Sequence, residues 1–412
     1  MQFAPNSSNL LLTETGRTWL QRFKESDRPL IRQITESLSL VSLQEFERSL
    51  QRVIEGISEE TEGVVALYAA REVPQVVGLG FRAGGSGLTS VAEGSDVGSE
   101  GRVANFVRQI CRTKPQKLLR QLSIEDLKKK RVRHIIIVDD LIGSGKRIRD
   151  YLTELWRDSS IKSWHSYKLL RFTIVAYAGT PDGVRKVEKH PSKPSVRIHR
   201  YCPTLNGLPW PREHRRQAQR LCVEYANSFS LKGWKLGFGG SAALLVFEHS
   251  CPNNVPGIFW ADSKDMSINW VPLFSGRATT SEIANVFPPE LVTRTPVSIL
   301  LSARKTRLAG AFAEVVNRPL AQETVIVLAM MGKGINRIDA ISHATGLGAE
   351  ETKALLEACI EQGLASPRRR LTDAGLAELA GLEAVVHLRT NPLPQLGEDS
   401  YYPRSLRGRI AG

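Results

Sequence analysis

Residues 134–147 read His134-Ile-Ile-Ile-Val-Asp-Asp-Leu-Ile-Gly-Ser-Gly-Lys-Arg147. The apolar residues up to Val138 predict a buried strand, and Asp139 and Asp140 follow at its end. Because ligands of parallel sheets bind at the carboxyl ends of the strands, carboxylates placed there are expected to contact a ligand. Adjacent strand residues point to opposite sides. We therefore expect one aspartate to bind sugar hydroxyls or a metal-bound water, and the other to face the sheet edge or a basic group.

A glycine-rich turn follows the strand. Gly143, Ser144 and Gly145 let backbone N–H groups turn toward an anion. The helix expected after them adds the positive end of its dipole, and Lys146 and Arg147 add full positive charge. The turn and the two aspartates together predict a site for a ribosyl phosphate or a nucleotide.

The end of this turn, Gly-Ser-Gly-Lys, also resembles the end of a P-loop. A P-loop needs a glycine where this chain has Asp140, and a serine or threonine where it has Arg147. Both departures argue against a P-loop.

Strands and helices alternate around this stretch, which is typical of a parallel sheet covered by helices. Short apolar runs rich in β-branched residues predict further strands at 64–70, 172–177, 196–201 and 242–247. Helical patterns occupy residues 105–111, 147–156 and 183–189. The segment 78–101, rich in Gly and Ser, predicts a long loop.

Helical patterns also flank the sheet region. Residues 1–60 are expected to be helical, and a capping box at Ser42–Glu45 predicts a helix that continues through Ile57. Pro288, Pro289 and Pro296 mark a linker.

A compact helical unit follows the linker. Helices are expected at 322–331, 337–345, 350–362 and 373–386, with a small hairpin at 364–372 before the last. This order is that of a winged helix-turn-helix.

The expected architecture is therefore α/β, with a parallel-sheet domain between two helical parts. The expected divisions are an N-terminal helical segment (1–60), the sheet domain (61–277), a linker (278–317), a winged helix-turn-helix domain (318–388) and a basic tail (389–412).

The composition limits the setting of the chain. No apolar run of 18 residues occurs and the N-terminus lacks the pattern of a signal peptide, so no membrane span is expected. The five cysteines are scattered, without a CxxC pair, which favours a reducing cytoplasm and argues against a zinc knuckle or a disulfide framework.

The formal net charge of +14 favours a polyanionic partner such as nucleic acid, or phosphorylated ligands. The positive charge is clustered, and each cluster is either a nucleic-acid contact or a solvated face. The clusters are Lys128, Lys129 and Lys130, the segment from Arg212 to Arg220, and Arg368, Arg369 and Arg370.

The 134–147 stretch resembles the phosphoribosyl-diphosphate-binding motif of type I phosphoribosyltransferases. The matching positions are Ile135, Ile136, Ile137, Val138, Asp139, Asp140, Ser144 and Gly145. The resemblance covers about residues 61–205. It implies that the acids bind the ribose 2′- and 3′-hydroxyls and that the loop holds the 5′-phosphate. Lys146 and Arg147 replace the small residues that usually close this loop, which argues against ordinary base salvage.

Two further segments fall at informative places. Arg71 follows the first strand, where the family places its diphosphate loop, and it is either a diphosphate contact or a solvated arginine at a strand end. Ser99 and Glu100, in Gly98-Ser-Glu-Gly101, lead into a helix and form either a second anion nest or a plain helix cap.

The segment 236–277 carries polar residues at the end of its strand. Glu248 and His249 could act as acid and base, although such a pair is more often structural. Asn253, Asn254 and Trp260 could line one side of the pocket, where an aromatic side chain could stack on a base or pack in a core.

Taken together, these segments resemble the divergent phosphoribosyltransferase-like proteins of bacterial conflict systems, including those encoded with retron reverse transcriptases. The resemblance implies an effector or toxin of anti-phage defence that carries a winged helix. The implied partners are phosphoribosyl diphosphate or a nucleotide, nucleic acid (DNA, msDNA or tRNA) and a reverse transcriptase. Mg²⁺ held through Asp139 or Asp140 is the implied cofactor.

The winged helix itself carries a mixed signal. Its third helix has four glutamates against one lysine, Lys353, and carboxylates that face phosphates would repel them. Arg368, Arg369 and Arg370 in the wing could still contact a nucleic-acid backbone, and a protein-binding role is equally compatible.

Three functions remain open from the sequence. The first is an enzyme that acts at C-1 of a ribose 5-phosphate, by transfer or by cleavage. The second is a catalytically silent nucleotide or phosphoribosyl-diphosphate sensor that passes its state to a nucleic-acid-binding winged helix. The third is an assembly protein that docks on a nucleic-acid complex.

Overall fold

The computed structural model of the 412-residue chain describes residues 7–73, 99–228, 231, 233–263, 270–288, 300, 308–309 and 322–390. The loop expected at 78–101 falls outside these residues up to position 98, and residues 99–101 begin a helix. Most of the expected linker and nearly all of the expected tail also lie outside them.

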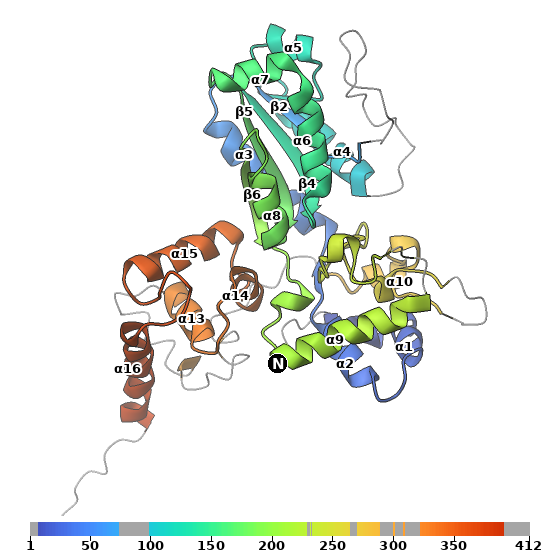
Figure 1. The fold of residues 1–412 in the computed structure, drawn as a ribbon, viewed down its shortest axis with the longest axis vertical. Helices are drawn as coiled ribbons and strands as arrows, with labels where there is room; N and C mark the ends of the chain where they lie inside the picture. Colours follow the sequence, from blue (N-terminus) through green and yellow to red (C-terminus); the bar gives the residue numbers. More distant parts are fainter. Residues whose placement is uncertain are drawn as a thin grey trace, which may run out of the picture.

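The centre of the chain is a five-stranded, all-parallel sheet (Figure 1). Its strands, in spatial order, are β3 (Leu118–Arg120), β2 (Val65–Ala69), β4 (His134–Ile142), β5 (Arg171–Gly179) and β6 (Ser195–Tyr201). From β2 the chain moves to one edge of the sheet, and from β4 it moves toward the other. The topological switch point, where open parallel sheets bind their ligands, therefore lies between β2 and β4.

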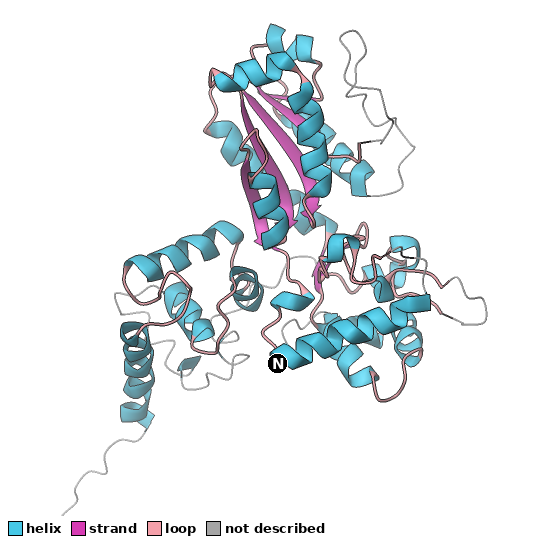
Figure 2. Ribbon diagram, viewed as in Figure 1, coloured by secondary structure: helices cyan, strands magenta, loops and turns pink. Residues whose placement is uncertain are grey.

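Helices cover both faces of this sheet (Figure 2). Along β4, Ile136 and Val138 face one core, and Ile135 and Ile137 face the other. The first core is closed by α3 (Leu43–Glu59) and α4 (Ser99–Thr113). The second is closed by α5 (Ile124–Lys129), α6 (Lys146–Arg157), α7 (Ser159–Ser166) and α8 (Pro181–Glu188).

The sequence predictions for this region are confirmed with one omission. Ser42 caps α3 by accepting a hydrogen bond from the Glu45 N–H at 3.2 Å, as the capping box predicts. The edge strand β3 was missed because it has three residues, of which only Leu118 is buried, and so shows no apolar pattern.

A second lobe lies beyond the carboxyl ends of the strands (Figure 1). Here β1 (Ser39–Val41) pairs in parallel with β7 (Leu245–Phe247) to form a separate two-stranded sheet. The strand predicted at 242–247 thus exists, but it does not join the central sheet. Its partner β1 is too short to show a strand pattern.

The N-terminal helices and the residues after the central sheet share one core in this lobe. The Trp19 indole stacks on Phe259 at a centroid distance of 5.3 Å and donates to the Ile258 carbonyl at 3.0 Å. The elements that contribute to this core are η1 (Ser7–Leu12), α1 (Glu14–Gln21), α2 (Arg28–Glu36), η2 (Leu205–Gly207), α9 (Arg212–Tyr225), η3 (Ala226–Ser228), η5 (Gly257–Phe259) and α10 (Ser281–Ala284). The short helices η4 (Phe238–Gly240) and η6 (Ser275–Arg277) have no buried residue.

The C-terminal unit has the predicted order of a winged helix-turn-helix. Its helices are α13 (Gln322–Met331), α14 (Ile338–Thr345), α15 (Ala349–Glu361) and α16 (Asp373–Thr390). Between α15 and α16, an antiparallel bridge joins Ala365 to Leu371, and the Ser366 N–H donates to the Arg370 carbonyl at 2.8 Å. This bridge forms the wing.

The winged helix packs on the β6 edge of the central sheet. Ala349, the first residue of α15, is buried in the same core as Ile198 of β6. Next to it, Arg197 forms an ion pair with Glu350 at 3.6 Å. The third helix of the unit therefore contacts the central sheet through its first turn.

All five cysteines are buried and free. Over the described ranges, no helix combines the length and the apolar character needed to cross a membrane.

A buried histidine at the start of β4 predicts a pH dependence of stability. His134 contacts Thr61 and Thr173 through its two ring nitrogens, and its Nδ1 accepts from Arg171 Nε at 3.2 Å. Burial, aided by the positive charge of Arg171, lowers the pKa of His134 to about 4. The neutral ring is thus the native form, while the unfolded chain takes up the proton near pH 6.5.

Between these pH values the unfolded state binds more protons, so stability is lost as the pH falls from about 6.5 to about 4. The loss from this group is at most about 3 kcal/mol. Urea unfolding across this window should show a smaller pH slope for His134→Gln than for the wild type. Equal slopes would show that this histidine is not the cause.

Candidate ligand-binding site

A pocket of about 540 Å³ opens at the switch point of the central sheet. One wall is the β4–α6 segment, which includes Asp139 and residues 141–148. Glu72 and Val73, just after β2, form a second wall. Residues of the second lobe close the pocket from the opposite side. The pocket therefore lies where ligands bind in open parallel sheets, as the sequence predicts.

The turn that begins the pocket has the backbone of an anion-binding loop. Gly145 takes φ +76°, in the left-handed region that favours glycine, and stands as the N-cap of α6. The Lys146 N–H donates to Ser144 Oγ at 3.3 Å. Within the described part of the chain, the N–H groups of Ser144 and Gly145 have no acceptor. Together with the start of α6, they present free donors to an anion.

Glycines are needed where this loop meets its neighbours. A Cβ at Gly143 would come within 2.1 Å of the Asn254 side chain, and a Cβ at Gly183 would come within 2.3 Å of the Gly143 carbonyl oxygen. The Thr180 hydroxyl, which caps α8, donates to that same carbonyl at 2.6 Å. The loop is thus held by α8 on one side and by Asn254 on the other.

Both aspartates of β4 lie against one guanidinium. Arg147 Nη1 is 2.9 Å from Asp139 Oδ1 and 3.5 Å from Asp140 Oδ1, and its Nε is 3.7 Å from Glu100. Separate directions were expected for the two side chains. Both nevertheless reach Arg147, and each carboxylate also accepts a hydrogen bond from the N–H of the next residue.

The pKa values of the two carboxyls shift in opposite directions. Burial raises the pKa of Asp139 well above its ordinary value, against the opposing effect of Arg147, and its side chain is only 1% exposed. Burial also acts to raise the pKa of Asp140, but the Arg147 charge leads the effects that together lower it. Asp139 Oδ2 is buried with no hydrogen-bond partner among the described residues. A ligand hydroxyl, which both donates and accepts, would satisfy that oxygen in either protonation state.

The cations of the loop are both engaged by acids. Arg147 is turned inward, and Lys146 pairs with Asp150 one helical turn along α6. Because the guanidinium lies against both aspartates, these carboxylates as they stand fit a guanidinium better than a directly bound Mg²⁺.

The opposite wall of the pocket includes Asn253 and Asn254, as expected, and two aromatic residues that were missed. Trp234 and Phe238 line the pocket, with their rings edge to face at 4.9 Å and Trp234 38% exposed. Asn254 fixes this wall, since its amide donates to Ser241 Oγ at 3.0 Å and to the Phe238 carbonyl at 3.3 Å. The glycines around Phe238 are the only sequence signal that pointed to these aromatics.

Comparison with known families bears on this arrangement. A family model described as PRTase-CE matches residues 17–275, more than half of the chain. The chain belongs to the PRTase-CE family. A second model, described as wHTH-PRTase associated, matches residues 325–408. No curated protein and no solved structure gives a match.

The PRTase-CE match covers the central sheet and most of the second lobe together. It confirms the phosphoribosyltransferase-like fold predicted from the 134–147 stretch, and the second match confirms the winged helix. Both walls of the pocket thus lie inside the PRTase-CE region.

Three predicted residues, Arg71, Ser99 and Glu100, are not part of the lining of the pocket at the switch point. Glu100 accepts from the Glu72 N–H at 3.0 Å and thereby ties the end of β2 to α4. Arg71 lies near α6, where its charge opposes the rise in the pKa of the buried Tyr151 phenol. Ser99 is the first residue of α4.

Glu248, His249 and Trp260 have surroundings that favour structural roles. The Glu248 carboxylate accepts from the Leu43 N–H at 2.7 Å, at the start of α3. His249 stacks on Phe247, and burial lowers its pKa to about 4. Asp140 is near enough for its charge to oppose this lowering of the His249 pKa. The Trp260 indole donates to the Val255 carbonyl at 2.8 Å, and its ring packs against the core of the second lobe.

The predicted nucleic-acid contacts lie in different places. Lys128 and Lys129 end α5 and Lys130 caps it, at the end of the sheet far from the pocket (Figure 1). Arg368 and Arg369, in the wing with Arg370, line a groove between the winged helix and α8.

Proposed function

We propose that this PRTase-CE chain binds a ribosyl phosphate or nucleotide at the switch-point pocket and acts at C-1 of the ribose, by transfer or by cleavage. The observation that carries the proposal is the loop 143–147, whose free N–H groups and helix start lie beside the buried aspartate pair. A phosphate fits the loop, and ribose hydroxyls fit Asp139, which lines the pocket. Asp140 is buried next to it, against the same guanidinium, and is not part of the lining.

The residues of the pocket suggest how such a reaction would be assisted. Asp139 would hold the ribose hydroxyls, and Arg147 would keep the carboxylates of Asp139 and Asp140 in place. Breaking the bond at C-1 leaves positive charge on the ribose ring and negative charge on a departing diphosphate. Arg71 and the Lys146 amine would stabilise the departing charge, while the backbone N–H donors of the loop would hold the 5′-phosphate. Trp234 and Phe238 would stack on a base and exclude water.

The biological setting forms a further part of the proposal. The resemblance to phosphoribosyltransferase-like proteins of conflict systems supports an effector of bacterial anti-phage defence, of the kind encoded with a retron reverse transcriptase. Mg²⁺ enters as a companion of the ligand's diphosphate, and no residue is assigned to it.

A second candidate is a catalytically silent sensor coupled to the winged helix. The packing of α15 on β6 favours it, because β6 belongs to the same sheet as the pocket. A ligand that shifted this sheet edge would change the docking of the winged helix.

Product analysis distinguishes the two candidates. The protein would be incubated with phosphoribosyl diphosphate, nucleotides and tRNA, with and without Mg²⁺, and the products followed by mass spectrometry. A product that the wild type forms and Asp139→Asn/Asp140→Asn does not form supports the enzyme. Tight binding without a product supports the sensor. A product that persists in the double variant would show that the reaction occurs elsewhere.

A further inference from the structure

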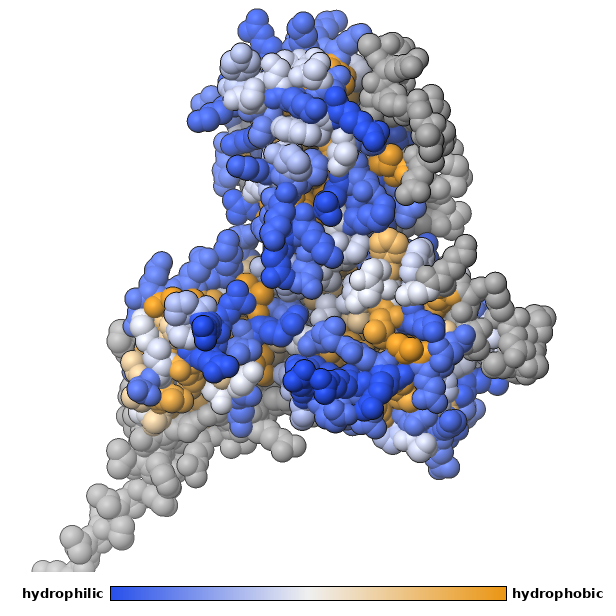
Figure 3. Space-filling model, in the orientation of Figure 1, coloured by the Kyte–Doolittle hydropathy of each residue, from blue (hydrophilic) through white to orange (hydrophobic). Residues whose placement is uncertain are grey.

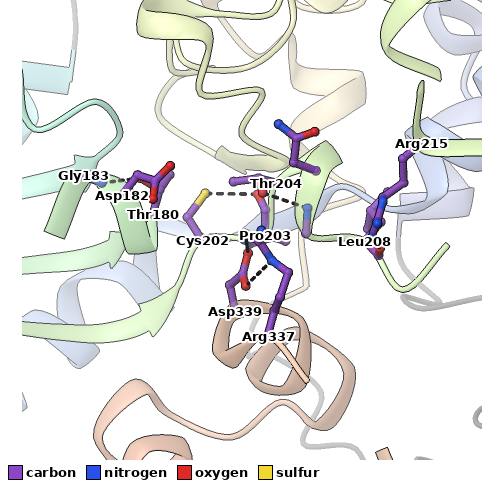
Figure 4. Close-up of polar contacts among 12 residues, drawn as sticks. Thr180, Asp182, Gly183, Cys202, Pro203, Thr204, Leu208, Arg215, Arg337 and Asp339 are labelled. Carbon is purple, nitrogen blue, oxygen red and sulfur yellow. Dashed lines mark hydrogen bonds and ion pairs between the residues drawn. The ribbon is translucent and has the colours of Figure 1, made fainter. Parts of the chain in front are cut away.

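The loop 143–147 has a second cavity on its other side. A pocket of about 410 Å³ shares Gly143 and Ser144 with the switch-point pocket, which is called the ligand pocket from here on. Its remaining walls come from the start of α8, from α9 and from Arg337, which caps α14 of the winged helix. Figure 4 shows Arg337 and Asp339 reaching up from α14 toward the segment that carries Thr204. The walls of the cavity thus come from the central sheet domain, the second lobe and the winged helix.

The lining of this cavity is strongly cationic. It carries five positive side chains and one carboxylate, that of Asp182, which is paired with Arg185. The positive side chains are those of Lys186, Arg212, Arg215, Arg216 and Arg337. Among the described residues, Lys186 and Arg212 have no carboxylate within ion-pairing distance. In the ligand pocket, by contrast, both loop cations are already paired.

Two of these arginines are fixed by the protein. Arg337 binds Asp339 with both Nε and Nη2, at 3.1 and 2.9 Å. Asp339 is 1% exposed and lies against Gly207 of the neighbouring lobe. Arg215 donates to the Leu208 carbonyl at 3.0 Å. Burial, with the nearby charges of Arg337 and Arg212, lowers the pKa of Arg215. Like charges are therefore crowded here, which an anionic ligand would relieve.

The cavity opens onto further polar surface on both sides. A groove of about 830 Å³, the wing groove, shares Pro181, Asp182 and Arg337 with this cavity and extends to Lys353, Arg368 and Arg369. Its lining is mixed in charge, because it also carries the carboxylates of Asp182, Glu188, Asp339 and Glu357. On the other side, strongly hydrophilic side chains gather over α9 (Figure 3). The ligand pocket and the cationic cavity thus meet at the loop 143–147, and the cationic cavity and the wing groove meet at the start of α8. One diphosphate would fill only part of these connected spaces.

We infer that the cationic cavity binds the phosphodiester backbone of a single-stranded nucleic acid, whose strand runs from the loop 143–147 past α8 to the wing. This rests on the proposed function in one respect: a terminal ribosyl phosphate of the strand would occupy the ligand pocket. The backbone phosphates would be held by the cations of α8, α9 and Arg337. A strand bound this way contacts the sheet domain and the winged helix at once.

Binding of labelled oligonucleotides tests this site. The full-length protein would be titrated against 5′-phosphorylated, 3′-fluorescein-labelled 12-nucleotide single-stranded DNA and RNA, with anisotropy read at several salt concentrations. The test variant is Lys186→Ala/Arg212→Ala, which removes two exposed cations of the cavity. The matched control is Lys189→Ala/Arg220→Ala, which removes one lysine at the end of α8 and one arginine of α9 outside the cavity.

The test variant should bind at least about 10-fold more weakly than the wild type. Because each single-strand phosphate contact contributes about 0.7 to the slope of log affinity against log salt, its slope should be shallower by about 1.4. The control should match the wild type. Inorganic triphosphate should compete weakly, and binding should strengthen from 4 to 12 nucleotides.

Three results would overturn the inference. They are unchanged binding by the test variant, equal weakening by the control, and length-independent binding that triphosphate fully displaces, which would identify a free polyphosphate as the ligand. Binding of phosphoribosyl diphosphate, measured in parallel, should be unaffected by the test variant. If phosphoribosyl diphosphate does not bind at all, the proposed function fails while the oligonucleotide result still decides this inference.

Discussion

Arg147→Ala is expected to lower the free energy of unfolding by about 3–5 kcal/mol, because it leaves buried carboxylates without their compensating charge. Arg147 Nη1 lies 2.9 Å from Asp139 and 3.5 Å from Asp140, and both acids are buried. The effect would be measured by urea unfolding near pH 7.

Lys146→Ala is the matched control, since it removes the neighbouring cation on the same helix. Its amine pairs with Asp150 at the surface, so the change should stay below about 1 kcal/mol. Adding Asp139→Asn to Arg147→Ala should restore part of the lost stability, because one stranded carboxylate is then neutral. A loss below about 1 kcal/mol for Arg147→Ala would contradict the assigned role of this guanidinium.

Gly183→Ala should also be strongly unfavourable, although an alanine normally stabilises a helix relative to glycine. The new Cβ would lie 2.3 Å from the Gly143 carbonyl oxygen and 2.8 Å from that of Ile142, both backbone atoms. Either α8 or the loop must therefore move. We expect a loss of about 1–3 kcal/mol in the free energy of unfolding and weaker ligand binding.

Gly56→Ala provides the control for this prediction. Gly56 lies inside α3, and a Cβ there would meet no atom within 4 Å. This change should stabilise the protein by about 0.5–1 kcal/mol. If Gly183→Ala also stabilised the protein, the close packing of α8 on the loop would be wrong.

The sequence predicted the parts of the fold that depend on local pattern. The apolar run before Asp139 predicted β4. All nine residues of β4 are buried, so the positions from Ile135 to Val138 are apolar on both faces of the strand. Ser42 predicted the start of α3 through a hydrogen bond that needs only neighbours in the chain. The helices of the winged unit could be predicted for the same reason.

The parts that were missed depend on contacts between distant residues. The pairing of Ser39 with Leu245 joins two three-residue strands about 200 positions apart. The apolar run at 242–247 predicted one of them, but nothing in the sequence named its partner, and that partner shows no strand pattern of its own. Arg147 was expected to face a phosphate because it directly follows the loop. Its position in the sequence does not show that its side chain turns toward the two aspartates. Its inward direction is set by the burial of those acids.

The same distinction applies to the candidate sites. The loop 143–147 lies within one segment, so its residues could be named from the sequence. Trp234 reaches the pocket from the second lobe, and Arg337 reaches the cationic cavity from the winged helix. The Arg212–Arg220 cluster was visible as charge, but only the fold shows that part of it faces Lys186 and Arg337 across a cavity.

The central claim is that the loop and the aspartate pair bind a ribosyl phosphate, and calorimetric titration with phosphoribosyl diphosphate tests it most directly. The wild type should bind one equivalent per chain. Asp139→Asn/Asp140→Asn, shown to be folded by its unfolding transition, should bind at least about 100-fold more weakly, as expected when charge-assisted hydrogen bonds are lost. No binding of phosphoribosyl diphosphate, ribose 5-phosphate or any nucleotide by the wild type, or equal binding by the double variant, would contradict the claim.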